Sequence, residues 1–123
     1  MIEDPLEQEQ AAATVFSYLI RGVSAESLNS PDSEKMKNIR SMLMEKMEPM
    51  KRLYAMSDEV YPLYVDNCIR QRKFMKIPEA IEVFGKAMES GRVSSFEERA
   101  MMQWITEIMK TNKTTGNIKT KRR

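Results

Sequence analysis

The residue types that most often carry catalysis are scarce in this chain. Histidine is absent from all 123 residues, and the single cysteine, Cys68, has no imidazole that could activate it as a nucleophile. Lone cysteines of this kind are commonly small core residues, so we expect Cys68 to be buried and inert. The lack of histidine also removes the commonest transition-metal ligand and any Glu-x-x-His pair for a di-metal site.

Carboxylates and glycines show no catalytic pattern either. The adjacent acidic pairs at 58–59 and 97–98 stand at expected helix starts, where capping and the helix dipole explain them. The four glycines are scattered through the chain, whereas a phosphate-cradling loop needs them close together before a helix. The sequence therefore predicts a protein that is not an enzyme and that has no cofactor and no metal.

Basic residues offer a first pattern for binding. The segment 110–123 has six basic and no acidic residues, which leaves 14 basic and 18 acidic residues in 1–109. Such a segment can neutralise nucleic-acid phosphates, although it could also be a nuclear address or a solubilising end. A second basic cluster spans 70–76, where Arg70 could instead pair with Asp66 on a helix or simply face solvent. The candidate nucleic-acid-binding residues are Arg70, Arg72, Lys73, Lys76, Lys110, Lys113, Lys119, Lys121, Arg122 and Arg123.

Methionine offers a second pattern. The chain has twelve methionines, of which six lie in 36–56 and three in 101–109. Thioether side chains fill irregular cores, but they also serve surfaces that adapt to partners. Helical spacing favours the core interpretation, and the alternatives are a homodimer or a groove for a partner helix. The candidate partner-binding residues, which lie at the margins of the apolar stripes, are Met42, Met44, Leu53 and Met102.

Start and stop signals place the first two helices. Asp4-Pro5 is a capping residue followed by proline, and the first helix is predicted from about residue 5 to about residue 21. A loop is expected over 24–30, after which Ser30-Pro31 starts the second helix. Its apolar stripe consists of Met36, Ile39, Leu43, Met47, Met50 and Tyr54. Because proline lacks a backbone donor, Pro49 predicts a kink or break over 45–49.

Three further helices are expected in the second half of the chain. The third starts between the cap signal at Ser57 and Pro62, and it ends before Pro78. The fourth covers about 78–90 and stops at Gly91. The fifth follows two overlapping capping boxes at 94–98 and ends near Thr111. Its wide apolar sector consists of Met101, Met102, Trp104, Ile105, Ile108 and Met109.

Composition sets the fold class. Apolar residues make up 41% and charged residues 31%, which is typical of a globular chain rather than a disordered or membrane-spanning one. The prediction is an all-α, compact bundle of about five short helices over 1–110, followed by a disordered basic C-terminal tail over 111–123. A lone thiol and the lack of a readable export signal favour a reducing cytoplasmic or nuclear location, and no membrane contact is expected.

These patterns support a ranked pair of functional hypotheses. The first is a non-catalytic helical accessory protein of a nucleic-acid-handling assembly, whose helical body docks a protein partner while its tail contacts DNA or RNA phosphates. The alternative is a protein–protein adaptor or assembly chaperone without nucleic-acid contact. A compact viral or phage factor would fit the size and composition.

Overall fold

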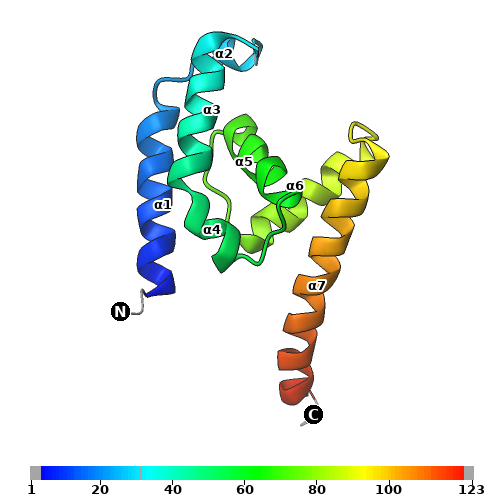
Figure 1. The fold of residues 1–123 in the computed structure, drawn as a ribbon. Helices are drawn as coiled ribbons and strands as arrows, with labels where there is room; N and C mark the ends of the chain where they lie inside the picture. The colour runs from blue at the N-terminus through cyan, green and yellow to red at the C-terminus, as the bar shows by residue number, and fades with distance from the viewer. Residues whose placement is uncertain (1–3, 31, 121–123) are drawn as a thin grey trace.

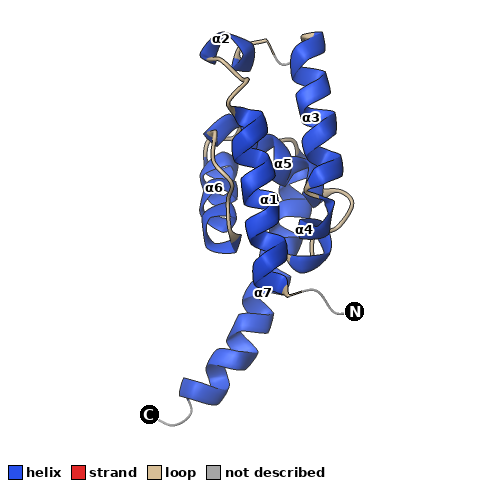
Figure 2. Cartoon of the chain, turned by 90° about the vertical axis from the view of Figure 1, so that its left-hand side faces the viewer, coloured by secondary structure: helices blue, strands red, loops and turns tan. Residues whose placement is uncertain are grey.

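The structure is a computed structural model, which describes residues 4–30 and 32–120, with side chains as far as Thr111. These residues form seven helices and no strand (Figures 1 and 2). The all-α fold class is therefore confirmed. The five expected helices are all present, and the two additional ones are short. One lies in the predicted loop, and the other is the part of the predicted second helix that follows its break.

Helix α1 (Pro5–Ile20) starts where the sequence predicts. The Asp4 side chain accepts a hydrogen bond from the backbone N–H of Leu6 at 3.1 Å, and Pro5 occupies the first turn, where a backbone donor is not needed. The helix buries Ala12, Phe16 and Ile20, which lie four residues apart and therefore on one face. Leu6 stands at the exposed start of the helix, so it does not belong to the buried stripe.

The segment between α1 and the next long helix corrects two predictions. The expected loop at 24–30 contains a short helix, α2 (Ala25–Leu28), because the Ser24 hydroxyl caps it by accepting from the N–H of Ser27 at 3.1 Å. Helix α3 (Glu34–Lys46) starts later than the Ser30-Pro31 signal predicts. The Ser33 hydroxyl caps it and accepts from the N–H of Met36 at 3.2 Å. Pro31 lies outside the described residues.

The break predicted at Pro49 is confirmed. Helix α3 ends at Lys46, Met47 has non-helical backbone angles, and α4 (Glu48–Leu53) begins with Pro49 in its first turn. A proline is favourable in a first turn because the N–H it lacks would have no partner there. The stripe of the two helices stays continuous across the break: Met36, Leu43, Met47, Met50 and Tyr54 are buried, and Ile39 is half-buried.

Three longer helices follow, each with a local start signal. Helix α5 (Val60–Gln71) begins after Ser57, whose hydroxyl accepts from the N–H of Val60 at 3.2 Å. Helix α6 (Ile77–Glu89) is followed by Gly91 in the left-handed region, as predicted. Helix α7 (Ser95–Thr120) begins with the predicted box between Ser94 and Glu97, in which each side chain bonds the other residue's N–H, at 3.1 and 2.9 Å.

The helices pack with α5 in the middle. Helix α1 lies along α3 and α4, α3 also packs against α5, and α7 packs against α5 and α6 on the other side (Figure 1). The core runs through all of these contacts, and its largest fully buried side chains include Phe16, Leu43, Tyr64 and Phe84. Each such side chain contributes roughly 1.5–3 kcal/mol by leaving water.

Most methionines of the described residues belong to this core. Those that are buried are Met36, Met47, Met50, Met56, Met75 and Met101, and those that are half-buried are Met44 and Met88. Flexible thioethers fill the irregular spaces where short helices meet at different angles. The core interpretation of the methionine stripes is thus confirmed for these positions.

Helix α7 is longer than its predicted end near Thr111. Its backbone continues to Thr120, because the sequence between them contains no proline and only one glycine, Gly116. Figures 1 and 2 both show its C-terminal half extending away from the other helices. The side chains of 112–120, and residues 121–123 entirely, lie outside the described part, so the disordered tail over 111–123 stays a prediction. No described helix is both long enough and apolar enough to cross a membrane.

Candidate functional site

The first predicted site, the basic cluster at 70–76, forms where α5 ends. Arg72 adopts left-handed backbone angles, with φ at 55°, and the N–H of Lys73 bonds the carbonyl of Cys68 at 3.0 Å. This is the hydrogen bond of a Schellman helix end, made here without the usual glycine. The Arg72 guanidinium donates to the carbonyl of Val23 and thereby ties the end of α5 to the segment between α1 and α2.

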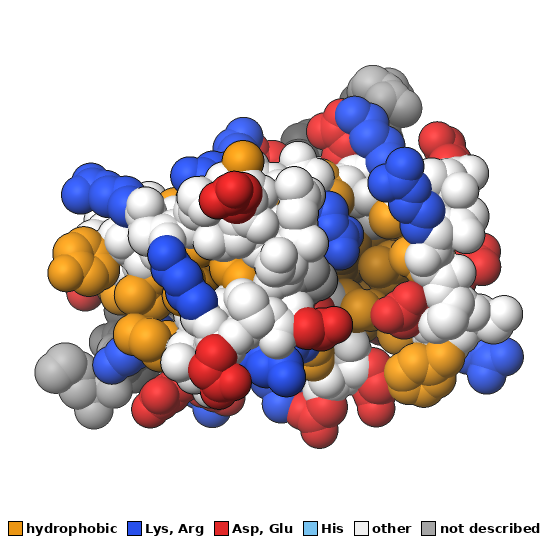
Figure 3. Space-filling model, turned by 90° about the horizontal axis from the view of Figure 1, so that it is seen from above, with side chains coloured by type: hydrophobic (Ala, Val, Ile, Leu, Met, Phe, Trp, Pro, Cys, Tyr) orange, Lys and Arg blue, Asp and Glu red, His pale blue; other side chains and the backbone are white. Residues whose placement is uncertain are grey.

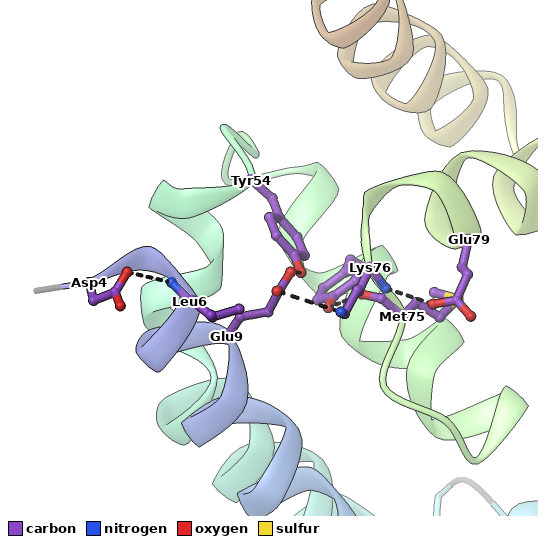
Figure 4. Close-up of polar contacts among 8 residues, drawn as sticks. Asp4, Leu6, Glu9, Tyr54, Met75, Lys76 and Glu79 are labelled. Atoms are coloured by element: carbon purple, nitrogen blue, oxygen red, sulfur yellow. Dashed lines mark hydrogen bonds and ion pairs between the residues drawn. The ribbon is translucent and has the colours of Figure 1, made fainter.

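The lysines of the cluster make ion pairs within the chain. Lys73 pairs with Glu79, and the ammonium of Lys76 lies 3.9 Å from a carboxylate oxygen of Glu9 (Figure 4). The hydrogen bond between Lys73 and Glu79 raises the pKa of Lys73. It also lowers the pKa of Glu79, which accepts a second bond from the backbone N–H of Lys76 at 2.9 Å. Two of the four predicted cations therefore have carboxylate partners on neighbouring elements.

Arg70 differs from the other three cations, and its expected partner is wrong. The carboxylate of Asp66 accepts from Arg40 on α3 at 2.5 Å, so it pairs across two helices rather than along α5. Arg70 instead makes a longer hydrogen bond of 3.3 Å to the side-chain oxygen of Asn67. Like the other three it is exposed, but its hydrogen-bond partner is a neutral side chain rather than a carboxylate or a carbonyl that holds the chain together.

The second predicted group of cations lies along α7 and beyond it. Lys110 is exposed on α7. Lys113 and Lys119 fall where the structure describes only a helical backbone, and Lys121, Arg122 and Arg123 lie outside the described residues. Because the end of α7 extends away from the body, it does not form one surface with the cluster at 70–76 (Figures 1 and 2).

The predicted partner-binding residues do not converge on one surface. Met42 on α3 and Met102 on α7 are exposed by 42% and 47%, and these two helices lie on opposite sides of α5 (Figure 1). Met44 and Leu53 are half-buried against the core. The backbone carbonyl of Met44 accepts from the hydroxyl of Tyr61 at 2.7 Å. Met42 and Met102 are therefore the two that remain available, at separate places.

A polar network around Tyr54 was not found from the sequence. The Tyr54 hydroxyl donates to Glu9 on α1 (Figure 4). The Tyr54 ring meets that of Tyr64 edge to face, with centroids 5.9 Å apart. The Tyr54 carbonyl accepts from the indole N–H of Trp104 at 2.8 Å. Burial, followed by the bond to Glu9, raises the pKa of Tyr54, so the phenol stays protonated. No sequence signal marks this network, because its members are 45 and 50 residues apart.

Cys68 has the environment of a structural thiol. It is completely buried on α5, and burial raises its pKa to about 12. The thiolate form that a nucleophile needs is therefore almost absent near neutral pH. Among the described residues, no three carboxylate or thiol side chains are grouped so that they could hold a metal ion.

A groove between α5, α6 and α7 includes Arg70 in its lining. Its volume is about 630 Å³, and its apolar lining comes from all three elements: Leu63 on α5, Val83 on α6, and Val93 and Met101 at and near the start of α7. Arg70 lies at its edge with Lys86 and Arg92. Seen from above, the molecule has a hollow with hydrophobic side chains on its floor (Figure 3).

Comparisons of the chain with protein-family models, with curated proteins and with solved structures give no significant match.

Proposed function

We propose that this chain is a non-catalytic helical accessory protein of a nucleic-acid-handling assembly. Its helical body docks a protein partner, and its basic segment 110–123 contacts DNA or RNA phosphates. The observation that carries this proposal is the division of charge. Residues 110–123 have six basic and no acidic residues, whereas 1–109 have four more acidic than basic residues. An anionic polymer is attracted to the first region and repelled by the second.

The contacts of the other basic cluster support assigning the phosphate contacts mainly to this segment. Arg72, Lys73 and Lys76 each bind a group of this same chain, and releasing them would expose the Val23 carbonyl and two carboxylates. Arg70 is the exception, because its partner is the neutral side chain of Asn67. The buried, protonated thiol of Cys68 supports the non-catalytic part of the proposal.

The test is a titration of labelled single- and double-stranded oligonucleotides, followed by fluorescence anisotropy from about 50 to about 200 mM salt. Six phosphate contacts on duplex DNA predict that log K falls with log salt at a slope of about −5. A variant with all five cations of 111–123 changed to glutamine keeps only Lys110 from this segment. Its slope should fall to about −1.

A matched control removes the same amount of charge from the body. Changing Lys35, Lys37, Lys46, Arg52 and Arg99 to glutamine neutralises five exposed cations on α3, α4 and α7. This control should keep the steep salt slope, because its segment 110–123 is intact. Equal affinity of the tail variant and the unaltered chain, or binding without salt dependence, would rule out phosphate contact by the segment.

A protein–protein adaptor or assembly chaperone without nucleic-acid contact is the second candidate. It is favoured by the outer surface of α7, where Phe96, Met102 and Met109 are exposed by 63%, 47% and 54%. Met102 and Met109 share one side of the helix with half-buried Ile105. The titration separates the two candidates, because an adaptor would not bind either oligonucleotide at any salt concentration. Sedimentation of the same samples tests the homodimer alternative.

A further inference from the structure

We propose that the groove between α5, α6 and α7 binds an acidic amphipathic segment of a partner protein. This inference rests on the proposed function, because it assigns the chemistry of the partner that the helical body docks. The groove is defined here by its apolar floor of Leu63, Val83, Val93 and Met101 and by the cations Arg70, Lys86 and Arg92 at its edge.

The floor requires an apolar occupant. Leu63, Val83 and Val93 are half-buried, so each keeps apolar surface in contact with water, while Met101 is buried beside them. Covering such surface stabilises a complex by roughly 25 cal/mol for each Å² removed from water. A volume of about 630 Å³ is enough for several aliphatic side chains to enter the groove together.

The charges at the edge require acidic groups around that apolar face. The groove also contains two carboxylates, but both have partners in this chain. Asp66 pairs with Arg40 at 2.5 Å, and Glu97 accepts from the backbone N–H of Ser94 at 2.9 Å.

The lining holds three cations, Arg70, Lys86 and Arg92, against two carboxylates, Asp66 and Glu97. Arg70 contacts the neutral side chain of Asn67, and Arg92 makes no ion pair with another described side chain. The ammonium of Lys86 lies 3.5 Å from Glu82, in an exposed pair along one helix that solvent screens. The excess charge at the edge is therefore positive, although the body as a whole is acidic.

The floor distinguishes an acidic protein segment from nucleic acid. A phosphate backbone could satisfy the three cations, but it offers no aliphatic groups to Leu63, Val83 and Val93. A helix with aliphatic residues on one face and Asp or Glu beside them satisfies both requirements at once. The groove and the segment 110–123 are thus assigned to different ligands.

The experiment is a selection with the full chain from a phage-displayed library of random peptides of about 15 residues. Enriched peptides should combine aliphatic residues at three- and four-residue spacing with Asp and Glu. Their affinities are then measured by fluorescence anisotropy against the full chain and two variants of equal charge. The first carries Arg70→Glu and Arg92→Glu at the groove, and the second carries Lys35→Glu and Lys37→Glu on α3.

Reversing the charge of the two arginines should lower the affinity for the acidic peptides by at least about tenfold, because like charges then face each other across the contact. The α3 variant should bind as the unaltered chain does. Circular dichroism and thermal melting of both variants confirm that they are folded. A neutral substitution, Arg92→Gln, should give a smaller loss in the same direction.

Three results would overturn the inference: no enrichment, enrichment of basic or uncharged peptides, or equal affinity for the unaltered chain and the groove variant. Loss of oligonucleotide binding in the groove variant but not in the tail variant would assign the groove to nucleic acid instead. If no acidic peptide binds the groove while the oligonucleotides bind with the expected salt slope, only the assignment of the groove is wrong. If acidic peptides bind but the oligonucleotides do not, the phosphate contact is wrong and the adaptor function is supported.

Discussion

Helices α5 and α7 pack against each other but differ in how much of their surface is buried. Seven of the twelve residues of α5 are buried, because α3 covers one side and α7 covers another. In the described side chains of α7, Met101 and Trp104 are buried, and Ala100, Ile105 and Ile108 are half-buried. The central helix α5 therefore has little surface left for partners. Helix α7 packs along one face, and its other faces are exposed to solvent.

This difference separates the structural role from the binding role. Tyr61, Tyr64 and Cys68 of α5 are reactive in principle, but their polar atoms are occupied or shielded inside the core. The hydroxyl of Tyr64, for example, donates to the carbonyl of Met75 at 2.6 Å. The groove lies instead where α6 and α7 meet the edge of α5, and α7 exposes Phe96, Met102 and Met109 to solvent.

Alkaline pH should have the largest effect, because it acts on the buried centre. Burial raises the pKa of Tyr54, Tyr61 and Tyr64, and it raises that of Cys68 to about 12. In the unfolded chain, tyrosine loses its proton at about pH 10 and cysteine at about pH 8.5. Above these values the unfolded state therefore binds fewer protons than the folded state does. Their stabilising contribution is complete below about pH 8 and is lost progressively as pH rises.

The expected result is cooperative alkaline unfolding, in which helical circular dichroism falls as tyrosinate absorbance rises. The thiol of Cys68 should react with a maleimide only as the chain unfolds. If the three buried phenols ionise while the helical signal persists, water reaches the centre of the fold. The conclusion that α5 is more deeply buried than α7 would then be wrong.

Truncation of Trp104 should have the next largest effect. Trp104→Ala removes a 3% exposed ring that meets Phe84 edge to face at 5.6 Å and bonds the carbonyl of Tyr54. We expect a loss of about 3–5 kcal/mol in the free energy of unfolding, measured in urea. Met102→Ala on the same helix is the matched control and should change stability by less than about 0.5 kcal/mol. Similar losses in the two variants would mean that α7 is buried on both faces.

Breaking the Arg40–Asp66 ion pair should have the smallest effect. Its side chains are 44% and 36% exposed, so solvent screens the attraction and the pair stabilises the chain by less than about 1 kcal/mol. Arg40→Ala should therefore lower the thermal midpoint only slightly, and high salt should reduce the difference further. A loss as large as that of Trp104→Ala would show that α5 is held by charge rather than by its apolar faces.

Much of the secondary structure could be predicted because its signals are local. The cap at Asp4-Pro5, the break at Pro49, the box between Ser94 and Glu97, and the stop at Gly91 all act within a few residues along the chain. Where two local signals competed, the prediction was less accurate. The start predicted at Ser30-Pro31 lies before the observed one, where the Ser33 hydroxyl caps α3.

The candidate site was less predictable than the helices. Charge counting identified the cluster at 70–76 and offered Asp66, four residues away, as one possible partner of Arg70. The structure pairs Asp66 with Arg40, 26 residues away, because α3 packs against α5. The groove was missed for the same reason, since Leu63, Val83 and Met101 are distant in sequence and belong to three elements.

The sequence by itself determined that the chain is helical, where several of its helices begin, and the buried stripe that runs through α3 and α4. In the last helix the predicted apolar sector was too wide, because Met102 and Met109 are exposed. Hydrogen bonds of a helix and of its caps join residues only two to four positions apart, so the amino-acid order specifies them. The tertiary structure decided which cations are occupied by carboxylates of the same chain and where a concave surface remains. Those outcomes depend on how helices pack, and packing joins residues without regard to their separation in sequence.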